Sequence, residues 1–449
     1  MRVMKWSAIA LAVTAASTQL ASAAAFVSDQ SEATGFVEGS KLDVKARNYY
    51  FNRHILHDEG RKDQRDWTQG FWGNFTSGYT QGLIGVGVDA FGYAGFKLSG
   101  DDKHSGSGNL TTDTTPNSDG FRDNHDSFGK AGAAVKFRVS KTELKIGDMQ
   151  PQNPVFAVGG SRLLPQTASG LSLQSSEIKG LDVEAGHYYS GTSQNDTSHD
   201  GSIFAQYANV QAKSADFGGG KYSITDNLGV GFYYAKLEDI WNQYYGNINY
   251  ALPLTDDQAL AFDFNIYNTK DTGSAKAGSI SNTAWSGSAA YSFLAAHTLT
   301  LAFQKINGNT PFDYIGIGDN NKGGDSIFLA NSIQYSDFNA PGERSWQARY
   351  DLNMATYGTP GLSFMARYVS GTNIDGTRGN NTIYQNATSY GADGSHHETN
   401  VEAKYVVQTG PAKDLSFRIR QAWHRANADE SEGDINEFRL IVDYPISVL

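Results

Sequence analysis

The sequence predicts an all-β protein: a transmembrane antiparallel β-barrel of about 18 strands, with one loop folded inward to constrict the interior. Segments of about eight to twelve residues alternate apolar and polar side chains from residue 36 to the end of the chain. The connections between these segments alternate between tight turns and long polar excursions. After the N-terminus no apolar run reaches the roughly 20 residues of a membrane helix, whereas a barrel strand needs only every second side chain to face lipid.

The N-terminus has the form of a secretory signal peptide. Arg2 and Lys5 precede a short apolar run, and Ala21-Ser22-Ala23 gives a small-x-small cleavage site. The run is too short for a transmembrane anchor. We therefore expect a signal peptide over residues 1–23 and a single outer-membrane β-barrel domain over residues 24–449.

Four later segments show the strand pattern clearly. They are "LAFDFNIYN" (260–268), "SWQARYDL" (345–352), "NVEAKYVV" (400–407) and "FRLIVDY" (438–444). In each, apolar side chains occupy one parity and mostly polar or charged side chains the other, as expected for strands with one face toward lipid. The segment "LSFRIRQAWHR" (415–425) places Phe417, Ile419 and Trp423 on the apolar face and Arg418 and Arg420 on the other.

The connections divide into two classes. "SITDNLGV", "LPLTDDQAL", "FLAAHTL" and "YGTPGLSF" contain Asp, Asn, Gly and Pro, which favour tight turns. Long polar stretches such as 100–127, 307–324 and 371–397 separate the other strand pairs. Short connections on one side and long ones on the other are typical of outer-membrane barrels.

One loop differs in composition. "PVFAVGGSRLLPQTASGL" (154–171) is rich in glycine, mostly apolar, and carries a single charge, Arg162. An exposed apolar loop of this size is an aggregation hazard, so burial is expected. We interpret residues 152–171 as a loop that enters the barrel and narrows the pore; packing on a neighbouring subunit is the alternative.

The composition limits the chemistry. The chain of 449 residues has no cysteine and a formal net charge of −11. Adjacent His396 and His397 would point to opposite faces of a strand, so no metal site and no cofactor are predicted. The basic residues are dispersed among strands rather than clustered on a helix, so nucleic-acid binding is not expected.

Long stretches of the sequence closely resemble the OprD family of substrate-specific outer-membrane channels, nearest to its basic-amino-acid branch. They include "RNYYFNR", "DWTQGF", "GGSRLLPQT", "GGDSIFLANSIQYSDFN", "SWQARYDLN", "HHETNVEAKYVVQTGPAKDLSFRIRQAWHRANAD" and "NEFRLIVDYP". The similarity runs from the leader to the last residue and is weakest in the loops at 100–124 and 378–395.

The resemblance implies a barrel of 18 strands, a monomer or a loose homotrimer, whose lumen narrows where inward loops meet. It implies one wall carrying a ladder of basic side chains: Arg53, Arg65, Arg162, Lys404, Arg418, Arg420 and Arg439. Arg65 is the weakest match, because the spacing before "DWTQGF" differs. Opposite the ladder the resemblance implies an acidic pocket formed by Tyr207, Tyr314, Ser332, Tyr335 and Asp337.

The residues themselves support part of this assignment. Lys404, Arg418, Arg420 and Arg439 lie on the polar faces of their segments, and parity places Arg47 and Arg349 on polar faces as well. A carboxylate is a natural guest for guanidinium groups. The alternative is that these cations pair with lumenal acids such as Glu402 and Asp443 and only stiffen the wall.

The expected function is facilitated diffusion of small carboxylate-bearing solutes across the outer membrane of a Gram-negative bacterium, without catalysis. Basic or zwitterionic amino acids and short peptides are the expected substrates, with related antibiotics as further candidates. Outer-membrane lipid is the expected surrounding. A non-selective pore and a porin for aromatic carboxylates are the alternatives within the same class.

An enzyme is the competing class. Ser326, His187 and Asp239 are the residues from which a serine-peptidase triad would be assembled. No G-x-S-x-G nucleophile elbow surrounds Ser326, so the sequence does not favour catalysis.

Overall fold

The computed structural model describes residues 25–57, 60–118, 120–320 and 323–448; the predicted leader at 1–23 lies outside them. The long strands are β1 (Lys41–Leu56), β2 (Gln64–Thr76), β3 (Gly85–Ser99), β4 (Ser127–Val139), β5 (Thr142–Met149), β8 (Thr167–Ile178), β9 (Leu181–Thr192), β12 (Ala215–Thr225), β13 (Leu228–Leu237), β14 (Trp241–Pro253), β15 (Ala259–Asp271), β16 (Ser281–Phe293), β17 (His297–Asn307), β19 (Arg344–Asn353), β20 (Leu362–Ile374), β21 (Gly394–Val406), β22 (Ser416–Ala426) and β23 (Asp434–Ser447).

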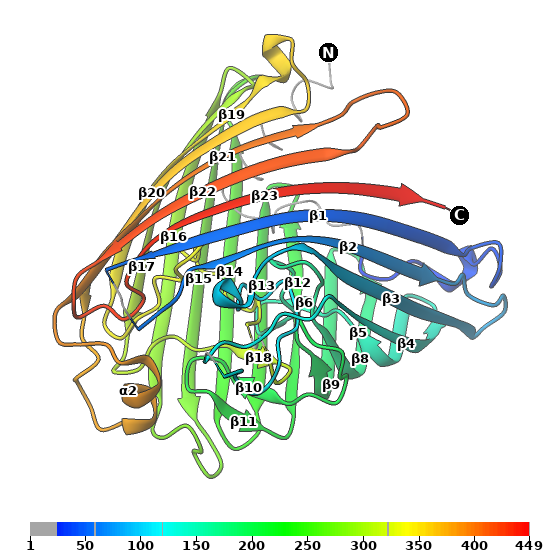
Figure 1. Ribbon diagram of the computed structural model, residues 1–449. Helices are drawn as coiled ribbons and strands as arrows, with labels where there is room; N and C mark the ends of the chain where they lie inside the picture. Colours follow the sequence, from blue (N-terminus) through cyan, green and yellow to red (C-terminus); the bar gives the residue numbers. More distant parts are fainter. Residues whose placement is uncertain (1–24, 58–59, 119, 321–322, 449) are drawn as a thin grey trace.

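These strands form one closed barrel. Each pairs antiparallel with its neighbours along the chain, and β1 also pairs with β23, which joins the two ends of the 18-stranded sheet. In Figure 1 the first strand, in blue, accordingly lies beside the last, in red. The predicted antiparallel barrel of about 18 strands is confirmed. Closure leaves no strand edge unpaired, which is what a chain crossing lipid requires.

Alternation sets the two faces of the barrel wall. On β22, Phe417, Ile419 and Trp423 are exposed on the outside, whereas Ala422 and His424 are buried inside. Because parity is strict within a strand, Arg418 and Arg420 share the inward face with Ala422 and His424. The predicted assignment of faces in this segment is therefore confirmed.

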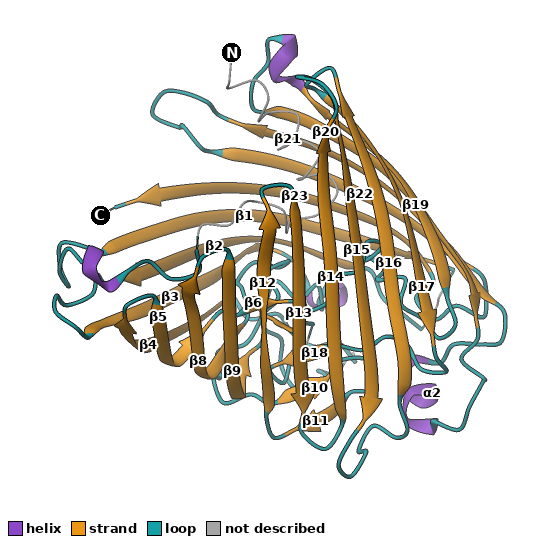
Figure 2. Cartoon of the chain, turned by 180° about the vertical axis from the view of Figure 1, so that it is seen from behind, coloured by secondary structure: helices purple, strands orange, loops and turns teal. Residues whose placement is uncertain are grey.

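The two ends of the barrel differ. Turns as short as 140–141, 179–180 and 226–227 join strands at one end, and connections as long as 100–126 and 308–343 join them at the other. Figure 2 shows the short turns and the longer loops at opposite ends of the long strands β12 to β17. The described helices lie in connections or before β1: η1 (Gln30–Glu32), η2 (Asp102–His104), η3 (Met354–Tyr357) and α2 (Thr382–Thr388). Among the described residues no helix combines the length and hydropathy needed to span a membrane.

Three long connections fold into the barrel. They carry the short strands β6 (Gln152–Asn153), β7 (Phe156–Ala157), β10 (Ile203–Ala205), β11 (Val210–Ala212) and β18 (Ile315–Ile317). β10 pairs with β11 and with β18, so the connections 193–214 and 308–343 form one small sheet. In both ribbon views the labelled short strands β6, β10, β11 and β18 lie within the outline of the barrel (Figures 1 and 2).

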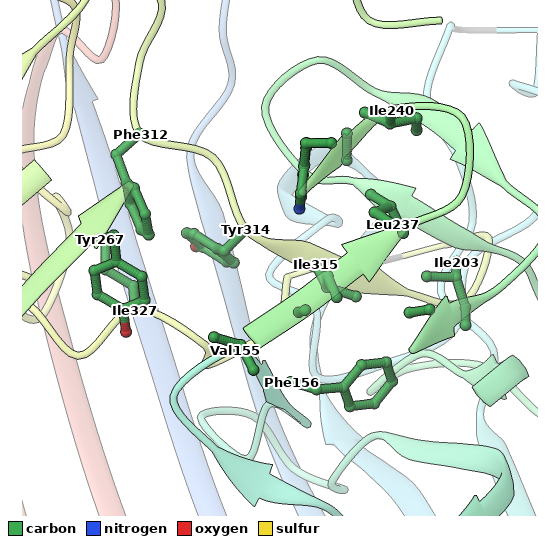
Figure 3. Packing of buried hydrophobic residues seen from close by; sticks show 14 of the residues in the cluster. Val155, Phe156, Ile203, Leu237, Ile240, Tyr267, Phe312, Tyr314, Ile315 and Ile327 are labelled. Atoms are coloured by element: carbon green, nitrogen blue, oxygen red, sulfur yellow. The ribbon is translucent and has the colours of Figure 1, made fainter. Parts of the chain in front are cut away.

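The apolar loop around Arg162 is among the inward segments. Residues 153–159 and 163–170 are buried within the single chain, so its apolar surface is covered without a neighbouring subunit. Figure 3 shows Val155, Phe156 and Ile315 from the connections packed in one cluster with Leu237 and Tyr267 from the wall. The expectation of an inward loop is confirmed.

Glycines on the wall make room for this loop. A Cβ atom added at Gly70 of β2 would lie 3.0 Å from Leu163 Cδ1, and one added at Gly95 of β3 would lie 2.5 Å from Phe128 and 3.0 Å from Leu163. Leu163 is fully buried between them. Close approach of the loop to the wall therefore requires residues without a side chain at these two positions.

Candidate functional site

Basic side chains concentrate on one wall of the lumen. The inward faces of β19 to β23 and β1 carry Arg349, Arg367, Lys404, Arg418, Arg420, Arg439, Lys45, Arg47 and Arg53, against the carboxylates Asp351, Glu398, Glu402, Glu437 and Asp443. Cations outnumber carboxylates on this wall, so pairing leaves positive charge uncompensated. Strand register brings the cations together, because Arg420 lies opposite Glu402 on one side and opposite Arg439 on the other.

Three guanidinium groups surround one aromatic ring. Arg53, Arg162 and Arg439 place their guanidinium carbons 5.3, 5.4 and 5.6 Å from the ring centroid of Phe51. Glu437 accepts from Arg53 Nε at 2.7 Å and from Arg439 Nε at 2.6 Å. The group combines β1, β23 and the inward loop, and it holds three cations around one carboxylate.

Arg162 is the member supplied by the inward loop. Its Nε donates to the Ser107 carbonyl at 2.7 Å, and Arg47 holds the loop by donating to the Arg162 carbonyl at 2.9 Å. Burial, with the neighbouring charge of Arg439, lowers the pKa of Arg162 to about 10. The guanidinium therefore remains charged near neutral pH and faces the two arginines of the wall.

Arg418 and Arg420 share a single carboxylate. Glu402 Oε2 lies 2.8 Å from Arg418 Nη2 and 3.1 Å from Arg420 Nε. Arg47 and Arg349 are paired as well, with Asp443 and Asp351. The arginines do form ion pairs with lumenal acids, as the alternative interpretation of the sequence expected. A carboxylate shared by two arginines nevertheless leaves a net positive charge.

The basic residues line cavities on both sides of the cluster around Phe51. On the side of the long connections, a cavity of about 520 Å³ is lined by Arg53, Lys62, Arg122 and Arg162 among others, and none of its described lining residues is a carboxylate. On the side of the short turns, a cavity of about 500 Å³ is bordered by several basic side chains, Arg349, Arg367, Lys404, Arg418 and Arg420. Basic side chains therefore continue through the barrel from one end toward the other.

The inward connections supply a carboxylate ringed by hydroxyl groups. Asp337 Oδ2 accepts from Tyr207 Oη at 2.8 Å and from Tyr314 Oη at 2.9 Å, and Oδ1 accepts from Ser332 Oγ at 2.6 Å. Burial and the charge of Asp337 raise the pKa of both tyrosines well above its usual value, so they remain donors. Four of the five residues expected in the acidic pocket are brought together.

A second carboxylate lies near this group. Asp325 is exposed and follows the pair Gly323-Gly324 in the inward connection 308–343. Enclosure within the barrel and the negative charge of Asp337 raise the pKa of Asp325 to about 6. Sequence reasoning missed Asp325, although it directly precedes Ser326 in a stretch that was singled out.

Tyr335 occupies a different position from the other pocket residues. Its hydroxyl donates to the Glu432 carbonyl at 2.9 Å and accepts from Arg61 Nη2 at 3.1 Å, while the Arg53 guanidinium lies 4.8 Å from its ring centroid. Tyr335 therefore belongs to the basic wall and contacts the cations rather than the Asp337 carboxylate.

Arg65 does not fit the predicted ladder. On β2 it shares the outward parity with Trp67 and Phe71, both 45 % exposed, and it lies 3.8 Å from Asp101 in the connection after β3. Asp66, the next residue, is the one that faces inward. Because one residue of register reverses a side chain, Arg65 is placed outside the lumen.

Arg61 approaches the lumen where Arg65 had been expected to do so. It lies in the connection between β1 and β2, and its Nη1 donates to the Glu432 carbonyl at 2.5 Å. The altered spacing before "DWTQGF" indicated that Arg65 matched the ladder poorly. It did not indicate which arginine points into the lumen instead. Arg367, by contrast, was missed although its parity on β20 was readable, and it donates to Asn400 Oδ1 at 2.8 and 3.0 Å.

The alternative serine-peptidase triad is contradicted. Ser326 is buried, and its hydroxyl has no hydrogen-bond partner among the described residues. His187 pairs with Asp216 at 2.6 Å on the outward parity of β9, and Asp239 pairs with Lys276 in the connection after β13. A barrel wall separates the histidine from the serine, so the three side chains form no catalytic group.

One cluster lies outside the predicted set. His396 faces inward, as parity on β21 requires, and meets His424 of β22 together with Glu430 and Glu432, with ligand atoms all within 4.8 Å of one another. The adjacent His397 faces outward and is exposed. Sequence reasoning correctly placed His396 and His397 on opposite faces, but it did not foresee partners from the next strand and loop.

Comparison with known proteins gives consistent results. The family model described as "outer membrane porin, OprD family" matches residues 34–448. Porin D of Pseudomonas aeruginosa is 63 % identical over the whole of both chains. A crystal structure of Pseudomonas aeruginosa OprD superposes with a TM-score of 0.82 at 60 % identity, covering 95 % of this chain and all of that one. A structure of Pseudomonas aeruginosa OpdK with vanillate gives a TM-score of 0.78 at 32 % identity, covering 92 % and 100 %.

Proposed function

The chain belongs to the OprD family of outer membrane porins, and on that premise we propose that it admits small carboxylate-bearing solutes, chiefly basic or zwitterionic amino acids and short peptides. It is an outer-membrane channel of a Gram-negative bacterium and not an enzyme. The observation that carries the substrate proposal is the series of basic side chains on both sides of the Phe51 cluster, together with the Asp337 carboxylate on the inward connections.

Passage requires no energy source. A carboxylate enters the cavity lined by Arg53 and Arg162, moves past Arg439, and reaches Arg420 and Arg418, exchanging one set of hydrogen bonds for the next. Each of Glu402 and Glu437 is shared by two arginines, which weakens the binding of the solute carboxylate to those arginines. Weaker binding permits release, because a channel site must both bind and release its solute. The gradient of the solute supplies the direction.

The Asp337 group favours a guest with a positive charge as well. Its carboxylate is held by three hydroxyl donors from Tyr207, Tyr314 and Ser332, so the negative charge has a fixed position. An ammonium or guanidinium group can interact with this charge while its carboxylate is held by the arginines. A basic amino acid satisfies both walls at once.

A solute with only a carboxylate is the second candidate. OpdK, a relative at 32 % identity, has been solved with vanillate. Such a guest would use the arginines but leave Asp337 and Asp325 as repulsive charges. The acidic pocket therefore favours amino acids over aromatic acids for this chain.

The test is saturable uptake into proteoliposomes, measured with labelled arginine and with benzoate. Arg418→Ala combined with Arg420→Ala should raise the half-saturation concentration for both solutes by about tenfold, the effect of losing charge-assisted hydrogen bonds of roughly 1.5 kcal/mol. Asp337→Asn should weaken arginine uptake alone. Arg65→Ala, on the outside of the barrel, is the control and should behave as wild type.

The outcomes separate the parts of the proposal. Unchanged uptake in the double arginine variant would make the pair a structural part of the wall. Unchanged arginine uptake in Asp337→Asn would remove the cation pocket. Flux that never saturates with either solute would indicate a non-selective pore.

A further inference from the structure

Four metal-ligating side chains meet at the end of the barrel where the long connections lie. His396 comes from β21, His424 from β22, and Glu430 and Glu432 from the connection 427–433. His396 and His424 are 4 % and 0 % exposed, and Glu430 is 5 % exposed. The group is separate from the residues of the proposed substrate path, so metal binding there is independent of which solute passes.

In each imidazole ring, the nitrogen that points away from the other ring (the outer nitrogen) donates a hydrogen bond. His396 Nε2 lies 2.8 Å from Glu343 Oε1, and His424 Nδ1 lies 2.7 Å from the Gly433 carbonyl. Glu343 is itself an acceptor, because its Oε2 receives the Ala340 N–H. Each of these ring nitrogens must therefore carry a hydrogen, which fixes the tautomer of each neutral ring.

The inner nitrogens then face each other with lone pairs. His396 Nδ1 and His424 Nε2 are 2.8 Å apart. Two lone pairs at this distance repel unless a positive species lies between or beside them. A proton shared by the rings satisfies the pair of nitrogens, and a metal cation satisfies them as well.

The carboxylates distinguish these two possibilities. Glu430 uses Oε2 to accept the Glu432 and Gly433 N–H groups, while its buried Oε1 has no hydrogen-bond partner in the described chain. Glu432 Oε2 also has no hydrogen-bond partner there, and lies 3.5 Å from His424 Nε2 and 3.8 Å from His396 Nδ1. A buried carboxylate oxygen without a donor is costly. A proton between the rings places a positive charge beside Glu432 but donates no hydrogen bond to either free oxygen, whereas a bound cation would contact both.

We propose that His396, His424, Glu430 and Glu432 bind one divalent transition metal of the zinc class. Metal bonds of about 2.0 to 2.2 Å place neighbouring ligand atoms about 3.0 to 3.5 Å apart, so the two rings need to separate by only a few tenths of an ångström. Two imidazoles with two carboxylates suit zinc, nickel or cobalt, whereas calcium and magnesium prefer ligand sets made only of oxygen.

The surrounding contacts are those of a supported metal site. Metal-bound histidines usually donate their other N–H to a carboxylate or a backbone carbonyl, which orients the ring. Glu343 and the Gly433 carbonyl provide these two partners here. The site would thereby join β21, β22 and the connection 427–433 to the inward connection that contains Glu343.

The site is also connected to the pore. The Glu432 carbonyl accepts from Tyr335 Oη and from Arg61 Nη1, and the Tyr335 ring lies 5.0 Å from that of His424. Ligation of the Glu432 side chain would fix the backbone that positions both residues. Metal binding is therefore expected to reduce current fluctuations of the open channel.

The test uses the full-length protein, purified in detergent without a polyhistidine tag, stripped with a chelator and titrated with ZnCl2 in a calorimeter. We expect one zinc per chain by elemental analysis and no comparable binding of CaCl2. His424→Gln and Glu430→Gln should lose this binding. Glu343→Gln, which removes only a supporting contact, should weaken it by about 10- to 100-fold.

His397→Gln is the matched control, because His397 is adjacent in sequence but faces outward, and it should bind zinc as wild type does. Folding of every variant is checked by heat-modifiable gel mobility. Should a variant not fold, the cobalt(II) absorption spectrum of the wild type replaces it, with visible bands expected for ligation by these four groups. Absence of stoichiometric zinc and of cobalt bands in the wild type, or wild-type binding by His424→Gln, would assign a shared proton to the pair instead.

Discussion

At the scale of single residues, two carboxylates of the barrel wall each bind two arginines. Glu437 binds Arg53 and Arg439, and Glu402 binds Arg418 and Arg420. Each carboxylate orients two guanidinium groups without neutralising both. This arrangement holds the cations in fixed positions and keeps a positive potential along the wall, which neither isolated arginines nor complete ion pairs would do.

Titration of Asp325 is expected to make arginine uptake depend on pH. Because the pKa of Asp325 is raised to about 6, its carboxylate is ionised at pH 7.5 and mostly protonated at pH 5. Loss of this charge should raise the half-saturation concentration for arginine about two- to fivefold as the pH falls, the effect of an exposed pair worth roughly 0.5 to 1 kcal/mol.

Proteoliposome uptake at the two pH values measures this change. In Asp325→Asn the additional rise should disappear, because the side chain no longer titrates, and uptake at pH 7.5 should resemble wild type at pH 5. An equal pH response in the wild type and in Asp325→Asn would mean that other titrating groups cause the pH dependence.

At the scale of elements, the inward connections depend on a few strong contacts with the wall. Tyr267 of β15 donates to the Pro154 carbonyl at 3.0 Å and accepts the Phe328 N–H at 2.9 Å, so one hydroxyl joins two connections. Lys130 of β4 is 6 % exposed and donates to the carbonyls of Pro165, Ser193 and Gln194. The pore width is therefore set by contacts between elements rather than by the barrel alone.

Lys130→Met tests this dependence. The apolar stem is retained, but three carbonyls lose their donor, which should destabilise the inward connections by about 1 to 3 kcal/mol. Single-channel recordings in planar bilayers should show higher conductance and more current noise.

Lys136→Met is the matched control for that variant. Lys136 lies on the same strand and face, is 3 % exposed, and pairs with Asp89 rather than with an inward connection. Its conductance should remain close to wild type. Equal increases in both variants would mean that loss of any buried lysine on β4 loosens the pore.

For the whole molecule, the charge of one lumenal wall has the opposite sign to the net charge of the chain. The chain carries a net charge of −11, yet the wall formed by β19 to β23 and β1 is basic. Net charge therefore says little about the solute that passes, because the passage senses only the residues facing it. Closure of the sheet between β1 and β23 brings the two ends of the sequence together to complete this wall.

Salt should weaken selective uptake through this distribution. Raising NaCl from about 0.05 to 0.5 M shortens the Debye length from roughly 14 to 4 Å. The half-saturation concentration for arginine should rise several-fold, whereas the flux of an uncharged sugar of similar size should stay constant. Proteoliposome swelling rates for both solutes check this, and a parallel fall of both would indicate that salt closes the channel.

Much of the fold and part of the site followed from local pattern. Strict alternation placed Phe417, Ile419 and Trp423 outside and Arg418, Arg420 and Arg439 inside, and the apolar composition of residues 152–171 indicated an inward loop. These predictions succeeded because parity and solvent exclusion are properties of short segments. The resemblance to a family then related distant residues, Asp337 among them, that no local pattern connects.

Other features depended on register and on long-range contact. Arg61 rather than Arg65 contacts Tyr335, and His396 meets His424, Glu430 and Glu432. His187 points outward from β9, whereas Ser326 is buried in an inward connection. The sequence by itself determined which side chains face lipid and which face the lumen, because that choice repeats every second residue. Only the tertiary structure decided which inward side chains meet, because pairing across a barrel depends on how the strands are staggered and how the loops fold inside.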